Sequence, residues 1–406
     1  MAVIIKNKLI VQKTILIFIL ISCLLTVEAQ WSSIVDYGIS TDGAVAFVIN
    51  DTAYVGGGVG SKSFYRYESE AEQWTQLSDI PSGYNRGWAF GFAINGKGYV
   101  CGGDKTGSFN LIKDVREYDP QTATWTQKAD LPIAMDGAFA CSVNGKAYIF
   151  GGFNGSYALN TVYEYDPLAD TWTSKTDYPS GQAIFPNGFV IDGKIYVGLG
   201  SASGMAGSNS FYEYNPTSDI WTQKANFPGN ARQATIAFKI GHTGYIGGGE
   251  ENYSSMFYDF YKYNPYNNSW TVANSLSLAS GSASAWCSSF VINNTAYYGL
   301  GASFAGGSLS YSKKWYKTSI SLNVNTNISS EKIQLFPNPA SEFLNIKISN
   351  DINFYSYQII DSTGKILEKG SNKPNLIKIS ELEIGTYYLK LRTEKGEIVK
   401  KFIKQL

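Results

Sequence analysis

The segment YEYDPLADTW, from Tyr163 to Trp172, decides the fold of this chain because the sequence writes it again and again. Close copies are REYDPQTATW (116–125), YEYNPTSDIW (212–221) and YKYNPYNNSW (261–270), and YRYESEAEQW (65–74) is a looser one. The successive tryptophans of these copies lie 51, 47, 49 and 49 residues apart. A period near fifty residues indicates an array of similar structural units.

Each repeat contains four short segments that read as β-strands. An apolar segment that ends near Asn-Gly, such as FACSVNG (139–145), is followed by a strand that closes on glycines, such as KAYIFGG (146–152). The Tyr-Asp/Asn-Pro strand comes next, and a Trp-Thr strand that runs to a proline completes the unit. Asn-Gly and glycine pairs favour turns, and proline ends strands. Four antiparallel strands in about fifty residues are typical of a β-propeller blade.

The two ends of the repeat array predict how the ring closes. The glycine-ending strand occurs six times, near Gly57, Gly102, Gly151, Gly200, Gly248 and Gly301. The sixth unit stops at SKKWYK (312–317), which aligns with a third strand, whereas WSSIVDYG (31–38) begins with an unassigned Trp. We expect the strand of Trp31 to complete the blade of Tyr297 and Trp315, which would leave no open sheet edge.

Composition excludes several classes of function. The 406 residues carry 33 Lys+Arg and 33 Asp+Glu, so no net charge indicates nucleic acid or an acidic membrane as a partner. The single histidine, His242, excludes a multi-histidine metal site, and we expect neither a metal nor another cofactor. Cys101, Cys141 and Cys287 lie in apolar strands without CxxC spacing, so we interpret them as small buried side chains.

The N-terminus reads as a targeting segment. Lysines at 6, 8 and 13 precede an apolar run from Ile15 to Val27, which predicts a signal peptide over residues 1–29 with cleavage after Ala29. LISC, ending at Cys23, leaves a lipoprotein signal as an alternative. The run is too short for a membrane anchor, so the mature protein should lack a transmembrane span. We expect a propeller over 30–318, a polar linker over 319–331 and a second domain over 332–406.

The glycine pair, the downstream Tyr and the Trp at this spacing resemble kelch repeats, and the resemblance covers nearly all of 31–317. It implies an all-β, six-bladed kelch-type propeller. Copper oxidases of the galactose oxidase type resemble this fold, but they need several His ligands, so their activity is not carried over to a chain with one histidine. Sialic-acid mutarotases also use six kelch blades, although no motif of theirs maps residue by residue onto this sequence.

The tail resembles a second family. FPNPASEFLNI (336–346), DSTGKIL (361–367) and IGTYYLKLRTEKGEIVKKFIKQ (384–405) look like the type A C-terminal sorting domain of Bacteroidetes type IX secretion substrates. Alternating strands such as YYLKLRT predict a small β-sandwich. The resemblance implies that the type IX machinery is a partner through residues 332–406, and that the chain is exported to the cell surface or the medium.

Candidate functional residues come from positions where the repeats differ. Seven residues before the end of each first strand the sequence has Gly43, Trp88, Gly137, Phe185, Ala234 and Trp286. Beside them lie charges that only some blades carry, namely Asp42, Arg86, Asp136 and Arg232. Aromatic faces stack on sugar rings, and Arg and Asp bind hydroxyls or carboxylates. This pattern predicts a ligand site at the channel mouth made of Arg86, Trp88, Asp136, Phe185, Arg232 and Trp286.

Two alternatives to this site remain open. The aromatic residues can simply plug the channel while the charges form pairs. Glu250 and Glu251 follow the glycines of the fifth repeat and could act as acids, but adjacent glutamates are usually solvated. The sequence predicts a binding module for a glycan or a protein, with a carbohydrate-active enzyme as the rival and a structural adhesion module as a third reading.

Overall fold

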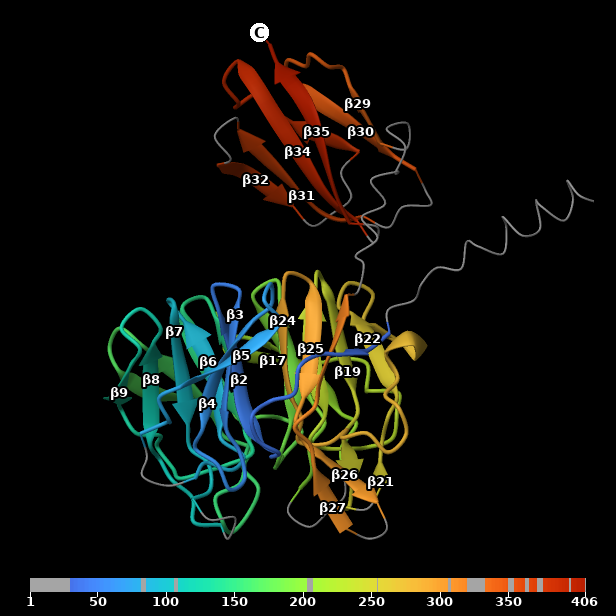
Figure 1. Ribbon diagram of the computed structural model, residues 1–406. Coiled ribbons are helices and arrows are strands. Elements are labelled where there is room, and N and C mark those ends of the chain that lie inside the picture. Colours follow the sequence, from blue (N-terminus) through green and yellow to red (C-terminus); the bar gives the residue numbers. More distant parts are fainter. Residues whose placement is uncertain are drawn as a thin grey trace, which may run out of the picture.

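The computed structural model describes residues 30–405, except 82–84, 106–108, 203–206, 254, 306–307, 320–332, 350–353, 362–364, 371–374 and 394–395. The predicted signal peptide, the lipoprotein alternative at Cys23 and almost all of the predicted linker therefore lie outside the described residues. Within the described part, residues 32–319 form six antiparallel four-stranded sheets, and residues 333–404 form two further sheets. Figure 1 shows the six blades in the lower part of the view and the two further sheets in the upper part.

The six sheets are the blades, and within five of them the strands follow one another outward in sequence order. Blades 1 to 3 contain β2 (Ala44–Ile49), β3 (Thr52–Gly57), β4 (Phe64–Glu68) and β5 (Gln73–Leu77); β6 (Phe90–Ile94), β7 (Lys97–Cys101), β8 (Val115–Asp119) and β9 (Thr124–Lys128); and β10 (Phe139–Val143), β11 (Lys146–Phe150), β12 (Val162–Asp166) and β13 (Thr171–Lys175). Blades 4 and 5 contain β14 (Asn187–Ile191), β15 (Lys194–Gly198), β16 (Phe211–Asn215) and β17 (Ile220–Gln223); and β18 (Ile236–Ile240), β19 (Thr243–Gly247), β22 (Phe260–Asn264) and β23 (Ser269–Val272), followed by a 3-10 turn η1 (Asn274–Leu276).

The sixth blade joins the two ends of the propeller chain. It contains β24 (Ser288–Ile292), β25 (Thr295–Gly299) and β28 (Trp315–Ser319), and its outermost strand is β1 (Ser32–Ser33). β1 pairs antiparallel with β28, with Ser32 opposite Lys317 and Ser33 opposite Tyr316. The predicted closure is confirmed, and the predicted fold class, a six-bladed all-β propeller, is correct.

The repeated ten-residue motif links three of the blades, 3, 4 and 5, to the blade before each. Its first Asp or Asn caps the turn between the third and fourth strands; Asp166 Oδ1, for example, accepts a hydrogen bond from the Leu168 N–H at 2.9 Å. The later Asp170 accepts one bond from the Tyr165 hydroxyl at 2.7 Å and another from the Ala129 N–H of the preceding blade at 3.0 Å. Blade 4 repeats this arrangement around Asp219, and blade 5 repeats it around Asn268. The motif therefore links each of blades 3, 4 and 5 to the blade before it.

The motif tryptophans add a second link between neighbouring blades. Each indole N–H donates to a backbone carbonyl of the preceding blade, at 2.7–3.4 Å. The six donors are Trp31, Trp74, Trp125, Trp172, Trp221 and Trp270. Trp31 donates to the Leu276 carbonyl and packs edge-on against Tyr298, with ring centroids 4.6 Å apart. Trp31, the second residue of the predicted mature chain, therefore belongs to the ring.

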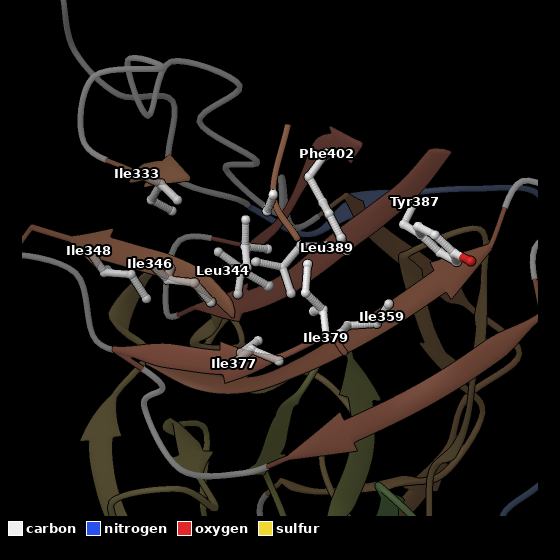
Figure 2. Close-up of a cluster of buried hydrophobic side chains, with 12 residues drawn as sticks. Ile333, Leu344, Ile346, Ile348, Ile359, Ile377, Ile379, Tyr387, Leu389 and Phe402 are labelled. Atoms are coloured by element: carbon white, nitrogen blue, oxygen red, sulfur yellow. The ribbon is translucent and has the colours of Figure 1, made fainter. Parts of the chain in front are cut away.

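The tail is a two-sheet sandwich. One sheet contains β29 (Ile333–Phe336), β30 (Phe343–Ile348) and β33 (Leu376–Lys378), and the other contains β31 (Phe354–Asp361), β32 (Ile366–Gly370), β34 (Gly385–Thr393) and β35 (Gly396–Lys404). Alternate residues of the strands point into a shared core that includes Leu344, Ile359, Leu389 and Phe402, as Figure 2 shows.

Two short hairpins, β20 (Glu250–Glu251) with β21 (Ser255–Met256) and β26 (Ala302–Ala305) with β27 (Ser308–Tyr311), extend from blades 5 and 6 of the propeller.

Closure by Trp31 predicts a large stability effect at the N-terminus. We expect Trp31→Ala to lower the free energy of unfolding by about 3–5 kcal/mol, because it leaves a cavity between blades 5 and 6. Trp31→Phe keeps an aromatic ring but loses the hydrogen bond to Leu276 and part of the ring volume, so its cost should be smaller, about 1–3 kcal/mol. Urea unfolding of the two variants beside the parent protein measures both effects. Equal stability of Trp31→Ala and the parent would contradict this closure.

Candidate functional site at the channel mouth

A closed ring of backbone hydrogen bonds surrounds one end of the central channel. Six residues, one from each blade, adopt positive φ values of 51–60° just before the innermost strand. The N–H of each donates to the carbonyl of its counterpart in the preceding blade at 2.8–3.3 Å, and the bond from Gly43 to Trp286 completes the circle. The six are Gly43, Trp88, Gly137, Phe185, Ala234 and Trp286. These are the six positions at which the sequence predicts the mouth.

Large and small side chains alternate around this ring. The aromatic residues belong to blades 2, 4 and 6, and glycine or alanine occupies blades 1, 3 and 5. A Cβ on Gly43 would collide with the Trp88 indole, and one on Gly137 would lie 2.8 Å from the Phe185 ring. Phe185 lies edge-on to both Trp88 and Trp286, with ring centroids 6.3 Å apart in each pair. The departure from repeat symmetry thus has a packing reason, since three large rings fill a space that six could not share.

Beneath the aromatic trio the channel contains a cavity of about 310 Å³. Its wall consists of the first residues of the six innermost strands, β2, β6, β10, β14, β18 and β24. One edge of each of these strands is unpaired within its own sheet. Side chains satisfy some of these edge carbonyls across blades; Ser288 Oγ, for example, donates to the Ala44 carbonyl at 2.7 Å. The cavity is therefore lined with polar backbone groups, although its mouth is aromatic.

Polar recesses lie between the aromatic residues, again in blades 1, 3 and 5. In these three blades the residue just before the small ring residue is Asp42, Asp136 or Gln233, and each of the three is buried. The blades with an aromatic ring residue have Gly87, Ile184 and Ala285 at the same position. Gln233 Nε2 donates to Glu250 Oε1 at 2.5 Å, and Ser201 Oγ donates to the Gln233 side-chain oxygen. The Tyr253 backbone N–H donates a hydrogen bond to Glu250 Oε2 at 2.5 Å. The mouth has an approximate threefold pattern of rings and carboxyl-bearing recesses.

The buried carboxyl groups have raised pKa values. Burial, followed by repulsion from Asp104, raises the pKa of Asp136 to about 8. Burial raises the pKa of Asp42 to about 6, against the opposing hydrogen bonds from its own backbone and from the Trp88 side chain. Burial also raises the pKa of Glu250. At neutral pH Asp136 is therefore mostly uncharged and can donate a hydrogen bond to a ligand.

The two predicted arginines lie inside the wall of the propeller. The Arg86 and Arg232 side chains have no solvent exposure. Arg86 pairs with Asp114 and donates to the Gly102 carbonyl at 3.3 Å. Arg232 contacts Asp259 through two nitrogens, at 2.6 and 3.3 Å, and donates to the Gly248 carbonyl at 3.1 Å. Both arginines support the glycine turns, and neither lines the channel cavity, so we leave them out of the proposed site.

Exposed aromatic side chains form a rim around the same mouth. They belong to the loops between second and third strands, which lie on the same face as the six ring residues because the strands are antiparallel. Phe109, Tyr157, Tyr253 and Tyr311 are 47–62 % exposed. Tyr253 stacks on Trp286 with ring centroids 5.7 Å apart and planes inclined by 16°, so it extends the aromatic trio outward. The repeat pattern does not predict this rim, since the loops differ in length and sequence between blades.

The remaining predictions concern metal binding, the three cysteines, a membrane-spanning segment and Glu250. The described residues contain no group of three or more His, Cys, Asp or Glu side chains placed to hold a metal ion. Cys101, Cys141 and Cys287 are free, and burial raises the pKa of each thiol. A search of the same described residues for a helix of membrane-spanning length and apolarity finds none. Glu250 is fully buried rather than solvated, because the hairpin β20–β21 folds it onto Gln233.

The chain belongs to the kelch-repeat family. The kelch-repeats domain described for KLHDC2, KLHL20 and DRC7 matches residues 43–230 and 94–302, ranges that together cover more than half of the chain. A secretion system C-terminal sorting domain matches residues 334–405. Both predicted resemblances are confirmed, and the second links the chain to type IX secretion and hence to export. The exact domain boundaries at 29, 318 and 331 stay predictions.

Individual relatives resemble only part of the chain. N-acetylneuraminate epimerase of Shigella sonnei is 36 % identical over 111 residues, and that of Escherichia coli K12 is 35 % identical over 111 residues. Each alignment covers 26 % of this chain and 30 % of the relative, so the chain matches under a third of the length of these curated proteins. The solved structure of YjhT has a TM-score of 0.59 at 19 % identity, covering 69 % of this chain and 96 % of that one. The structural likeness shows a shared fold.

The raised pKa of Asp136 predicts a pH-dependent stability. The pKa of the Asp136 carboxyl group is about 8 in the folded protein and 3.8 in the unfolded chain. Between these two pH values the unfolded chain loses the proton more readily, so ionisation favours unfolding. The parent protein should therefore lose stability as pH rises from about 4 to 8, by at most about 1.4 kcal/mol per pH unit from this group. Asp136→Asn removes the ionisation, so its stability relative to the parent should increase with pH. Urea unfolding at pH 5 and pH 7.5 tests this, and parallel pH profiles for the two proteins would count against it.

Proposed function

We propose that this chain is an exported propeller that binds a glycan at the channel mouth. The observation that carries the proposal is the combination of an aromatic trio, an exposed aromatic rim and carboxyl-bearing recesses on one face of the ring. Aromatic rings stack on the apolar faces of sugars, and carboxyl groups bind sugar hydroxyls. The rings also make the site rigid, because each aromatic residue is fixed by the hydrogen-bonded circle beneath it.

The charges of the mouth favour a neutral or amino-substituted sugar over an acidic one. Asp42, Asp136 and Glu250 all lie beside the ring, and each is buried. Arg86 and Arg232, which an acidic sugar could otherwise use, are already bound to Asp114 and Asp259. An ammonium group would be stabilised by the carboxyl groups and by the faces of Trp88 and Tyr253. A protein ligand that presents a cationic side chain would fit the same chemistry.

A sugar-converting enzyme is the second candidate. It is favoured by the partial identity to proteins named N-acetylneuraminate epimerase, at 36 % over 111 residues. Asp136 would be the residue of interest, because a carboxyl group with a pKa of about 8 can exchange a proton near neutral pH. The paired state of both arginines weighs against an acidic substrate such as N-acetylneuraminate. Interconversion of sugar anomers, followed by NMR and abolished by Asp136→Asn, would favour this candidate.

Rim substitutions separate binding at the mouth from binding elsewhere. We expect Tyr253→Ala to weaken glycan binding at least fivefold, because the ring that stacks on Trp286 contributes about 1 kcal/mol or more to a centrally placed contact. Leu168→Ala is the matched control, since Leu168 is 91 % exposed in a turn on the opposite face. A glycan array, followed by titration of the strongest ligand against both variants, provides the measurement. Equal affinity of the two variants would place the ligand away from the mouth.

A further inference from the structure

The face opposite the mouth carries a second departure from repeat symmetry. In the turn between the first two strands, blades 1, 2, 3 and 6 have Asn50, Asn95, Asn144 and Asn293, whereas blade 4 has Asp192. In the turn between the third and fourth strands, blades 2, 3 and 4 have Gln121, Leu168 and Thr217, whereas blade 5 has Tyr266. The one histidine, His242, lies in the first turn of blade 5. These three exceptional residues come together in space.

Asp192 is the centre of this group, which we call the turn-face patch: Asp192, His242, Asn264 and Tyr266. The Tyr266 hydroxyl donates to Asp192 Oδ2 at 2.8 Å, and His242 Nδ1 lies 3.1 Å from Asp192 Oδ1. The hydrogen bond from His242 is the largest of the effects that lower the pKa of Asp192 to about 2. Blades 4 and 5 thus present a fixed carboxylate beside a half-exposed aromatic ring.

The sorting domain contacts this patch with complementary groups. Tyr355 on β31 stacks on Tyr266 with ring centroids 3.9 Å apart and planes inclined by 8°. Asn264 Nδ2 donates to the Tyr355 hydroxyl at 3.4 Å. Arg392 on β34 places Nη1 3.5 Å from Asp192 Oδ1. Ser356 and Arg392 are opposite each other across β31 and β34, so one end of a single sheet supplies both contacts.

We infer that the turn-face patch is a docking site for the chain's own sorting domain. The contact includes a ring stack, a hydrogen bond and an ion pair. Beside it lies an open cleft of about 970 Å³ lined by Asp192, Tyr266, Tyr355 and Arg392. A small contact suffices within one chain, since a short tether gives an effective concentration on the order of millimolar. Docking through the ends of β31 and β34 leaves the C-terminal end of β35 on the side away from the propeller (Figure 1). The docked domain therefore presents its C-terminus outward, where export machinery can reach it.

Cross-linking distinguishes a docked domain from a freely tethered one. The full-length Asn267→Cys/Lys369→Cys variant carries one thiol on each side of the cleft and keeps the Tyr266–Tyr355 stack intact. The parent chain sets the background from its own cysteines. Ala169→Cys/Lys369→Cys is the control, because Ala169 occupies the position of Asn267 in the corresponding turn of blade 3. With a short bis-maleimide we expect the first pair to cross-link at least about tenfold faster than the second. Equal rates for the two pairs would overturn the docking site.

A second variant tests the patch without added thiols. Asp192→Asn/Tyr266→Thr installs residues that other blades carry at the same positions, so the propeller should keep its fold. We expect a larger radius of gyration in small-angle X-ray scattering and faster proteolysis between residues 320 and 332. Unchanged scattering and unchanged proteolysis would show that the patch does not hold the domain. Glycan binding at the mouth is independent of either result.

Discussion

The circle is the constraint on which the rest of this structure depends. Four strands cannot cover both faces of their own sheet, so each blade is stable only between two neighbours. The motif Trp and the positive-φ residue each bind the preceding blade, and both series return to their starting point. The motif Asp or Asn adds a link in blades 3, 4 and 5. The chain itself is linear, so one blade must combine both of its ends. β1 meets β28 for this reason, and without β1 the sixth blade would lack the outermost strand that the other five blades have.

The same circle explains why the mouth is asymmetric. Six residues must adopt the left-handed backbone conformation at the mouth of the channel. If all six were glycine, the channel would be open; if all six were aromatic, the rings would overlap. Alternation of Trp88, Phe185 and Trp286 with three small residues fills the space and leaves room for buried carboxyl groups in the remaining blades. Packing therefore accounts for the positions of the aromatic residues, and their chemistry makes that packed surface a candidate ligand site.

The sequence predicts the periodic features well and the side-chain pairings poorly. Blade number, closure by Trp31 and the six ring positions follow from the repeats, because they depend on spacing alone. The pairing of Arg86 with Asp114 and of Arg232 with Asp259 does not, since the partners lie 28 and 27 residues apart in loops without a shared motif. A signal was nevertheless present: two arginines at equivalent repeat positions, each followed by an aspartate at nearly the same distance. A charge that recurs with its counter-charge in register indicates a structural pair rather than a ligand contact.

A ring of like units has two faces, and each face can acquire a role only where it departs from the repeat. On the mouth face the departures are aromatic and acidic, and they converge on one axis. On the turn face the departures are confined to two neighbouring blades, so the surface they create is off-axis and suited to a partner that approaches from one side. Other blades form the same two turns with Asn in place of Asp192 and with Thr in place of Tyr266. Because the fold does not require these two side chains, their placement opposite Arg392 and Tyr355 is best explained by contact with the sorting domain.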